Sequence, residues 1–493
     1  MLLVWLLIQT ETVQNWIVKK VTVRLSKDLN TEVKIKHVSF ELFNRMNLEG
    51  TLVKDRNKDT LLYAEQLKVR LTDWFFLKDE IVLKFVGLED AQIHLTRQDS
   101  VWNYQFLVDY FSAPKSTTKK KSKSNLKLNL QKVDFKNIRL VQNDLWVGRR
   151  MEVKLTSLQL DAEDFDINEN RIQIRQLDLD NPFFAIDDFP GVKAKKIKSK
   201  IPVQDTGYYF NDANLHLTVG KVNIKNGTFS NQKFTERAPY PHFDGMHLRF
   251  SKINGTINDI SFIKDTMKAK VDLSGKERSG FELRKLKTDF KLTPQKMEFA
   301  NLDLITPESH LQNYYAMSYE DFNTDFGDFI HKVSMDVRFV NAEIDSDDLA
   351  YFAPAAKTWK RRITIAGKAK GKVDAFNIED LFVRAGNTTI NGDLSMIGLP
   401  DINATQIKFT SGSLRTTYSD LTTFVPAIKK VTTPSIASLG NILFKGNFNG
   451  TTTKFVTAGT FSTNLGGFTA NIAMALPSKG LASYSGRIIT KQF

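Results

Sequence analysis

The sequence predicts a mainly β protein, built as a many-stranded antiparallel sheet with an N-terminal helix and short interspersed helices. Three observations carry this prediction. Apolar and polar residues alternate along most of the chain, which is the period of a half-buried strand. Asn-Gly pairs recur, and they are typical of two-residue hairpins. One stretch near the N-terminus has helical spacing instead.

Composition sets limits on the function. The 493 residues are 41% hydrophobic and 25% charged, as in folded proteins, and they suffice for about three domains or one long repeat array. The absence of cysteine excludes disulfides, thiolate metal ligands and a cysteine nucleophile. A net charge of +14 favours anionic partners, either nucleic acid or membrane headgroups. We expect no nucleic-acid partner, because the one dense basic run, at 115–123, contains no stacking aromatic residue.

The chain opens with a short apolar run, which we expect to be the tail of a membrane-spanning helix. A buried strand is the alternative, since eight apolar residues are fewer than the roughly 20 that a spanning helix needs. An amphipathic helix pattern follows it directly, with Val13, Trp16, Ile17, Val21 and Leu25 at helical spacing. Both ends of the chain look like cuts. The predicted anchor residues are Leu2, Leu3, Val4, Trp5, Leu6, Leu7 and Ile8.

The strands follow a recurrent unit with apolar residues at i, i+2, i+5 and i+7. It occurs at residues 33–40, 128–135, 153–160, 172–179 and 217–224. These positions share no face of a helix, but on a strand they form two alternating stretches with one inserted residue. The spacing therefore predicts β-bulges or short corners within the strands.

Four Asn-Gly pairs, at 226–227, 254–255, 391–392 and 449–450, are predicted to form hairpin turns. Many strands on short turns make an antiparallel meander. Because the strands alternate apolar and polar residues, one face of the sheet should be buried and the other wet.

The C-terminal third contains an internal repeat. The pattern D-L-x-x-F-x-P-A-x-K occurs at 348–357 and again at 420–429, each time after a strand and before glycine-rich strands. We expect Asp348 and Asp420 to cap short helices that the proline ends. The Pro/Ser/Thr/Lys-rich stretch at 112–124 is predicted to be a long hairpin tip or a flexible linker.

A search for chemistry finds no strong motif. No phosphate-binding glycine loop or nucleophile elbow is present. His242 and His247 have no zinc-ligand spacing, and Asp345 begins a calcium-like loop without its glycine and glutamate. The acidic residues at 161–166 suggest only a turn. We therefore expect no enzyme, no metal and no cofactor, although carboxylates brought together from distant strands stay open.

Taken together, the apolar start, the L-x-L-x-x-V-x-F strand at 128–135, the segment GKVNIKNGTF at 220–229 and the two D-L-x-x-F-x-P helices give the chain a resemblance to the TamB/AsmA-like family of Gram-negative envelope proteins. Residues 1–111 look like the AsmA-type start, and 125–493 resemble the central β-region. The family's C-terminal domain has no counterpart here.

The resemblance implies an elongated, curled sheet (a β-taco, or repeating β-groove) with an apolar inner groove. It implies a single-pass inner-membrane protein, mostly periplasmic, that carries phospholipid towards the outer membrane and supports outer-membrane assembly. An outer-membrane assembly protein of the BamA/TamA type would be the partner of the missing region. The candidate groove residues are Leu128, Leu130, Val133, Phe135, Leu155, Leu158, Leu160, Ile172, Ile174, Leu177, Leu179, Val222 and Ile224.

Two other functions stay open. One is a chaperone-like module that engages outer-membrane β-barrel proteins by strand addition. The other is a β-solenoid enzyme acting on anionic polysaccharide. The predicted regions are 1–28 (anchor end and helix), 29–111 (AsmA-like β unit), 112–124 (linker), 125–340 (β-groove region) and 341–493 (strand–helix–strand repeats).

Overall fold

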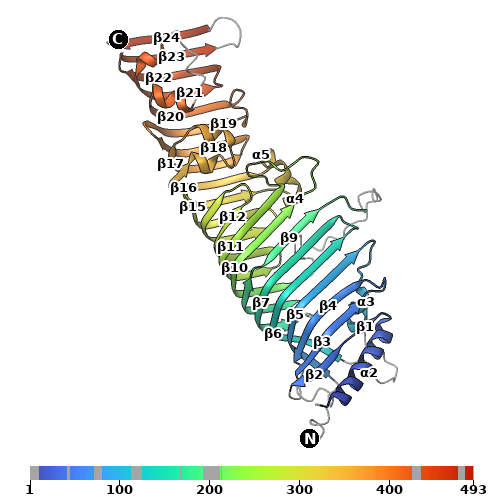
Figure 1. Ribbon diagram of the computed structural model, residues 1–493. Helices are drawn as coiled ribbons and strands as arrows, with labels where there is room; N and C mark the ends of the chain where they lie inside the picture. Colours follow the sequence, from blue (N-terminus) through green and yellow to red (C-terminus); the bar gives the residue numbers. More distant parts are fainter. Residues whose placement is uncertain are drawn as a thin grey trace. The chain divides into compact units, whose positions relative to one another are not determined.

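The computed structural model describes residues 10–41, 45–70, 80–112, 125–166, 169–192, 211, 214–424, 435–475 and 483–491. The chain forms two compact units. Unit 1 comprises Met1–Pro239 and Met246–Arg278, and unit 2 comprises Tyr240–Gly245 and Ser279–Phe493. Both are mainly β and mostly antiparallel, with one 19-residue helix near the N-terminus and short helices elsewhere, which confirms the predicted fold class (Figure 1). The predicted region boundaries stay predictions.

In its described residues, unit 1 contains two helices and the strands β1 to β12. The helices are α2 (Glu11–Leu29) and α3 (Gln105–Ser112). The strands are β1 (Val33–Lys34), β2 (His37–Glu41), β3 (Arg45–Lys54), β4 (Thr60–Arg70), β5 (Glu80–Arg97), β6 (Asn125–Asp144), β7 (Arg149–Asp166), β8 (Arg171–Asp180), β9 (Phe183–Asp188), β10 (His216–Gln232), β11 (His247–Ile263) and β12 (Thr266–Glu277).

The sheet of unit 1 departs from a simple meander at two junctions. β5 pairs with β6 in parallel, and β10 runs parallel to β8 and β9, which together form one interrupted strand beside β7. Parallel neighbours need a long crossover. Residues 98–124 connect β5 to β6, and residues 189–215 connect β9 to β10. In the stretch at 112–124, the residues from 113 lie outside the described part.

Unit 2 is an uninterrupted antiparallel meander. Its strands are β13 (Glu282–Thr293), β14 (Lys296–Ile305), β15 (His310–Ser318), β16 (Ser334–Asp345), β17 (Arg362–Lys372), β18 (Ala375–Ala385), β19 (Thr388–Ile397), β20 (Gln406–Thr417), β21 (Asn441–Gly450), β22 (Lys454–Thr463), β23 (Gly466–Ala475) and β24 (Ser483–Lys491). The short helices are α4 (Phe322–Asp325), η3 (Phe326–Asp328), α5 (Phe329–Lys332), α6 (Ser346–Leu349), η4 (Pro354–Thr358), α7 (Tyr418–Phe424) and η6 (Ile436–Leu439).

The long strands bend where left-handed residues interrupt them. In unit 1, Asp90, Asn137, Asn181 and Asn226 have φ between 49° and 53°. The neighbours of Asp90 pair with the neighbours of Asn137, so the two residues lie side by side, and the Asn137 amide donates to the Asp90 carboxylate at 2.5 Å. Asn137 lies in the gap of the apolar run Val133, Phe135, Ile138 and Leu140, and the strand register shifts within 128–135 and within 172–179, which confirms the predicted bulges at these places.

The Asn-Gly pairs lie mostly at these bends, and the hairpin prediction is wrong for three of them. Residues 226–227, 254–255 and 391–392 are inside β10, β11 and β19, and only the pair at 449–450 ends a strand at a turn. The reason is that a positive φ is needed at a bend as much as at a turn. The observed hairpins use other residues, such as Lys264 and Asp265 between β11 and β12.

Helices α2 and α3 pack together at one end of the unit 1 sheet. Leu29 of α2 and Phe106 of α3 are 6% and 5% exposed, and they form a cluster with Val53 of β3 and Leu95 of β5. The helix predicted around Trp16 is therefore confirmed, and Leu25 of the predicted pattern packs against this cluster. Trp16 is 60% exposed, because the buried face of α2 runs through Leu25 and Leu29.

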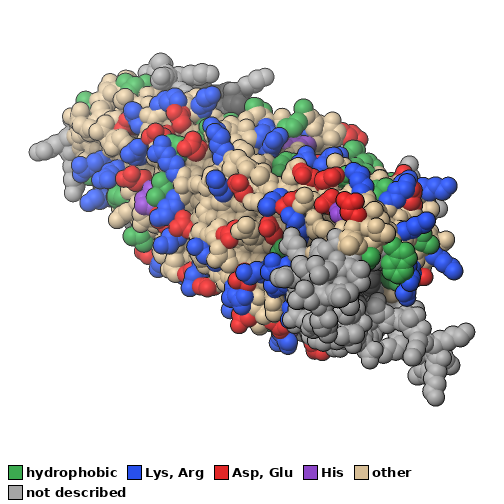
Figure 2. Space-filling model, turned by 60° about the horizontal axis from the view of Figure 1, so that its bottom comes forward, with side chains coloured by type: hydrophobic (Ala, Val, Ile, Leu, Met, Phe, Trp, Pro, Cys, Tyr) green, Lys and Arg blue, Asp and Glu red, His purple; other side chains and the backbone are tan. Residues whose placement is uncertain are grey.

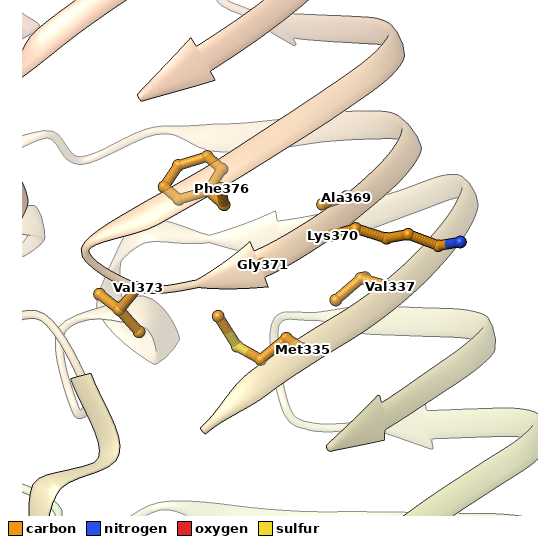
Figure 3. A pocket seen from close by; sticks show the side chains of 7 residues that line it. All are labelled: Met335, Val337, Ala369, Lys370, Gly371, Val373 and Phe376. Carbon is orange, nitrogen blue, oxygen red and sulfur yellow. The ribbon is translucent and has the colours of Figure 1, made fainter. Parts of the chain in front are cut away.

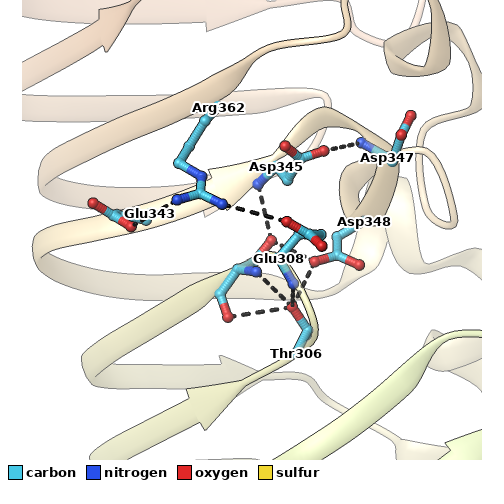
Figure 4. A network of polar contacts seen from close by, with 8 residues as sticks. Thr306, Glu308, Glu343, Asp345, Asp347, Asp348 and Arg362 are labelled. Carbon is cyan, nitrogen blue, oxygen red and sulfur yellow. Dashed lines mark hydrogen bonds and ion pairs between the residues drawn. The ribbon is translucent and has the colours of Figure 1, made fainter.

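The two repeat copies form equivalent clamps in unit 2. Asp348 of α6 accepts hydrogen bonds from Thr306 and, at 2.6 Å, from Ser309 in the β14–β15 turn (Figure 4). Asp420 of α7 accepts from the backbone N–H of Asn387 in the β18–β19 turn at 2.7 Å. Each short helix is thus tied to the turn two strands earlier.

These aspartates were predicted to be N-caps, which is wrong for Asp348. Asp345 caps α6 by accepting from the Asp347 N–H, and Asp348 lies inside the helix. Asp420 likewise lies inside α7, two residues after its start. Both carboxylates are buried, so tertiary hydrogen bonds to the turns take the place of a capping bond.

Candidate functional site: apolar sheet faces

One face of the unit 1 sheet is lined by apolar residues from strand to strand. Residues directly opposite each other in neighbouring strands share a face. One such row crosses seven strands without a polar residue: Val86, Val133, Leu160, Leu177, Val222, Ile257 and Val271. The next row is Leu67, Leu88, Phe135, Leu158, Leu179 and Ile224. We call this surface the unit 1 apolar face.

The bends keep the apolar residues of both strand halves on this face. Phe135 and Ile138 flank the left-handed Asn137, and both belong to one cluster with Leu88, Leu155 and Leu158. Without the inserted residue, the strand beyond the bend would present its polar side chains instead. A one-residue insertion therefore makes the apolar surface continuous around the bend.

The unit 1 apolar face is only partly removed from solvent. Val133, Phe135, Leu158, Leu160 and Leu177 are half-buried. In the described chain, the main contacts of each strand are with its hydrogen-bonded neighbours, and α2 and α3 reach the sheet at one end. These side chains therefore keep part of their apolar area accessible to solvent in the described residues.

The predicted groove residues fall largely on this face. Leu155 and Val222 are buried, at 8% and 6% exposure. The half-buried members are Leu130, Val133, Phe135, Leu158, Leu160, Ile172, Ile174, Leu177, Leu179 and Ile224. The side chain of Leu128 lies outside the described set, although its backbone pairs with Leu83. Eight of the predicted groove residues lie in the two rows given above. Their contact with lipid stays a prediction.

The prediction missed part of the unit 1 apolar face and all of the apolar surface of unit 2. It omitted Val86, Leu88 and Ile257, which extend the rows, and it named nothing in unit 2. A usable signal was present in β5, because Val86, Leu88, Ala91 and Ile93 keep the i, i+2, i+5, i+7 spacing with alanine as the third apolar residue.

Unit 2 carries a comparable face that is richer in aromatic residues. One row runs Phe290, Phe299, Tyr315, Val337, Ala369, Ile378, Leu394, Phe409 and Phe448. The rings of Phe290 and Phe299 lie 5.3 Å apart. Burial raises the pKa of Tyr315 to about 12, so this phenol is neutral at any physiological pH. We call this surface the unit 2 apolar face.

An apolar pocket of about 160 Å³ opens on the unit 2 face. Met335 and Val337 of β16, Ala369 and Gly371 of β17, and Phe376 of β18 line it, and Figure 3 shows them lying within the fold of the bent strands. Gly371, with φ at 126°, lets the backbone of β17 approach β18, since a Cβ atom there would lie 2.3 Å from the Ala375 carbonyl oxygen. Lys370 points away from the pocket (Figure 3).

The opposite faces are charged, and lysines, arginines and carboxylates intermingle on the view in Figure 2. Lys68 and Lys136 both donate to Glu89 at 3.0 Å. Hydrogen bonds from Lys136 and then Lys68 hold the pKa of this carboxyl below its usual value, so the Glu89 site stays ionised at neutral pH.

The acidic cluster at 161–166 belongs to this charged face. Asp161 pairs with Arg175 at 2.6 Å, and Asp164 pairs with Arg171 at 2.6 Å. Cross-strand pairing to arginine thus accounts for both carboxylates. Glu163 is exposed, and the side chain of Asp166 lies outside the described set.

The described residues also offer no metal centre. They contain no group of three or more His, Asp or Glu side chains that could hold a metal ion. His247 is buried and contacts Gln232 and Thr235 at 3.0 and 2.8 Å, whereas His242 belongs to the other unit and stacks on Tyr240. The predicted anchor residues 2–8 lie outside the described part, in which no helix has the length and apolar character to cross a membrane.

Comparison with known proteins adds no relative. No family model, curated protein or solved structure matches this chain. The two apolar faces are therefore the feature of the molecule from which its function has to be argued.

Proposed function

We propose that this protein is a membrane-anchored periplasmic scaffold that carries phospholipid between the inner and outer membranes along its apolar faces, and so supports outer-membrane assembly. The observation that carries the proposal is the unit 1 apolar face, which crosses seven strands without a polar residue in its longest row. No chemical step is required of the protein.

Acyl chains suit such a surface on physical grounds. Apolar area removed from water contributes about 25 cal/mol per Å², and it requires no specific polar contact. The half-buried leucines and valines of the unit 1 apolar face keep area that a ligand could still cover. Charged headgroups would stay in solvent, because none of the rows contains a charge to receive them.

Lipid movement along the faces would be diffusive. Apolar contacts have no preferred direction along the rows, so a chain can shift by one strand spacing without breaking a hydrogen bond. Any net direction has to come from the membranes or proteins at the two ends. A partner of the BamA/TamA type at the outer membrane belongs to this proposal.

The test is native mass spectrometry with lipid extraction on the full chain, purified without detergent from a Gram-negative host. Ile257→Asp places a carboxylate in the apolar row between Val222 and Val271. We expect fewer bound phospholipids, and about tenfold or more weaker binding of a fluorescent phospholipid.

The matched control is Asn258→Asp, the same new residue one position along β11. Asn258 stands opposite Lys221 and Lys270 on the charged face, where a carboxylate is well placed. Lipid binding should be unchanged. The proposal would be refuted if the wild-type chain is stably folded, carries no lipid and binds none. The apolar side chains would then pack against one another instead of against lipid.

A second function is favoured by one observation at the end of unit 2. In the described chain β24 pairs only with β23, and Tyr484 and Ile488 are 76% and 53% exposed. Exposed apolar side chains on a strand suit contact with an extended segment of another protein, so a chaperone-like role for outer-membrane β-barrel proteins is the alternative. Crosslinking from position 484 to an unfolded barrel protein, with a lipid-free chain, would support it.

A further inference from the structure

We propose that α2 binds the surface of an anionic membrane through one exposed face of the helix. This face, the α2 stripe, consists of Trp16, Lys19, Lys20, Val23 and Lys27. All five side chains are exposed, and Trp16 and Val23 are 60% and 62% exposed. The inference goes beyond the proposed lipid carriage and does not depend on it.

The stripe is a continuous surface by helix geometry. Its members are spaced at i, i+3, i+4, i+7 and i+11, which places them on one side of a helix with 3.6 residues per turn. The stripe runs along most of α2, from its second turn to its last. A flat surface could therefore touch all five residues at once.

The opposite side of α2 is already used. Leu25 and Leu29 pack into the cluster with Val33, Leu61 and Phe106, and Gln14 is only 5% exposed. The protein thus holds the helix with the α2 stripe outward. Burial of the stripe against the described part of unit 1 would require α2 to turn over and expose Leu29.

The chemistry of the stripe matches an anionic lipid surface. Tryptophan prefers the interface between headgroups and acyl chains, and lysine can extend its ammonium group to phosphates while its methylenes cover apolar area. The Lys20 ammonium lies 4.6 Å from the centre of the Trp16 ring, so the positive charge and the aromatic group already form one unit. Among the described residues none of the three lysines forms an ion pair with the protein.

Charge complementarity selects an anionic bilayer as the occupant. Three lysines in the stripe and Arg24 beside it face outward, while the nearest acid, Asp28, pairs with Arg24 at 3.6 Å. A helix with a basic, tryptophan-containing outer face is typical of binding at a membrane interface. The net charge of +14 for the whole chain acts in the same direction.

The test is flotation of the full chain with vesicles of phosphatidylcholine alone and of phosphatidylcholine mixed equally with phosphatidylglycerol. We expect tighter binding to the mixed vesicles, weakened by added salt. The triple variant Lys19→Gln, Lys20→Gln, Lys27→Gln should lose binding on the order of 100-fold, since each lysine near an anionic surface contributes about tenfold or less. Trp16→Ser with Val23→Ser should lose about tenfold.

Matched controls distinguish binding through the α2 stripe from binding through the overall positive charge or through other exposed apolar residues. Lys221, Lys225 and Lys268 are exposed lysines on β10 and β12, and their triple change to Gln removes the same charge. Phe234 and Val340 are 58% and 59% exposed and provide the apolar control, Phe234→Ser with Val340→Ser. Both control variants should bind mixed vesicles as the wild-type chain does.

Three outcomes would overturn the inference: no vesicle binding by the wild-type chain, equal binding to both vesicle types, or equal losses in the stripe and control variants. Lipid extraction from the same samples keeps the two proposals apart. Stripe variants should retain bound phospholipid if the apolar faces carry it. A wild-type chain without bound lipid that still binds vesicles through the stripe would refute lipid carriage alone.

Discussion

Strands β5–β10 of unit 1 and β19–β22 of unit 2 bend in the same way but with different residues. In β5–β10 the bends are at Asp90, Asn137, Asn181 and Asn226, whose side chains are exposed. In β19–β22 glycines occupy the bends. Gly392 in β19 has φ at 142°. Gly412, Gly446 and Gly459 lie opposite one another in β20, β21 and β22.

The glycine bends bring backbones closer together than the Asn/Asp bends. A Cβ atom on Gly446 would lie 2.1 Å from the Ala458 carbonyl oxygen. Phenylalanine rings cover this row from the apolar side: Phe409 and Phe444 are 9% and 6% exposed, and the ring of Phe461 is 4.7 Å from that of Phe444. Aromatic rings commonly protect a glycine in a sheet in this way.

The comparison shows that the residue type at a bend decides which side chains pack on the inner, apolar side of the bent strands. A left-handed Asn or Asp hydrogen-bonds outside, as Asn226 does to Asn181 at 2.6 Å, and it leaves the inner side to aliphatic residues that stay half-buried. A glycine row lets phenyl rings pack onto the backbone. The same curvature is therefore compatible with a partly open face in β5–β10 and a better filled one in β19–β22.

The largest effect should come from adding one methyl group to the glycine row. In Gly446→Ala the new Cβ meets main-chain atoms that cannot rotate away, so we expect a loss of about 3 kcal/mol in local stability. The measurement is hydrogen exchange of β20–β22. Asn137→Gly is the counterpart in unit 1, where glycine accepts the same φ, and its loss should stay within about 1 kcal/mol. Equal losses at the two positions would remove the distinction.

A smaller effect is expected at Gly412, where the obstacle is a side chain. A Cβ atom there would lie 2.0 Å from the Phe409 ring, which can move. Gly412→Ala should lose about 1–3 kcal/mol in the stability of β20. In the double variant with Phe409→Leu the loss should be less than the sum of the single losses. Strict additivity in this double-mutant cycle would show that the ring does not protect the glycine.

The smallest effect concerns pH and the charged face. Burial opposes ionisation of Glu152, but hydrogen bonds from Lys154 and Arg139 outweigh it and lower the pKa of this carboxyl, as the two lysines do for Glu89. A lowered pKa stabilises the fold above the unfolded value near 4.5, and this contribution is lost as the pH falls through the folded pKa. Each site should lose about 1 kcal/mol or less.

The same acidification should affect β19–β22 less. Among the described residues these strands form no ion pair that joins their side chains, whereas within β4–β7 Glu89 binds two cations and Glu152 binds three. Hydrogen exchange at pH 7 and pH values below 4, corrected for intrinsic rates, compares the two regions. Greater loss of protection in β19–β22 than in β5–β7 would contradict this account.

Much of the fold could be predicted from local patterns. The spacing of Val133 and Phe135 before Ile138 indicated a bulged strand, and the left-handed Asn137 lies in the gap between Phe135 and Ile138. The repeat around Asp348 and Asp420 indicated strand–helix–strand units, which the element order confirms. The parallel pairings of β5 with β6 and of β8 with β10 were not predictable in this way, because alternation is the same in parallel and antiparallel strands.

The sequence by itself determined the strand character, the bulges and the helical start, because these follow from side-chain periodicity and from residues that accept a positive φ. Only the tertiary structure decided which strands are neighbours, that Asn226 bends a strand instead of closing a hairpin, and that Asp348 clamps the turn at Thr306. Those outcomes depend on contacts between residues distant in the chain, and a local pattern carries no information about its distant partner.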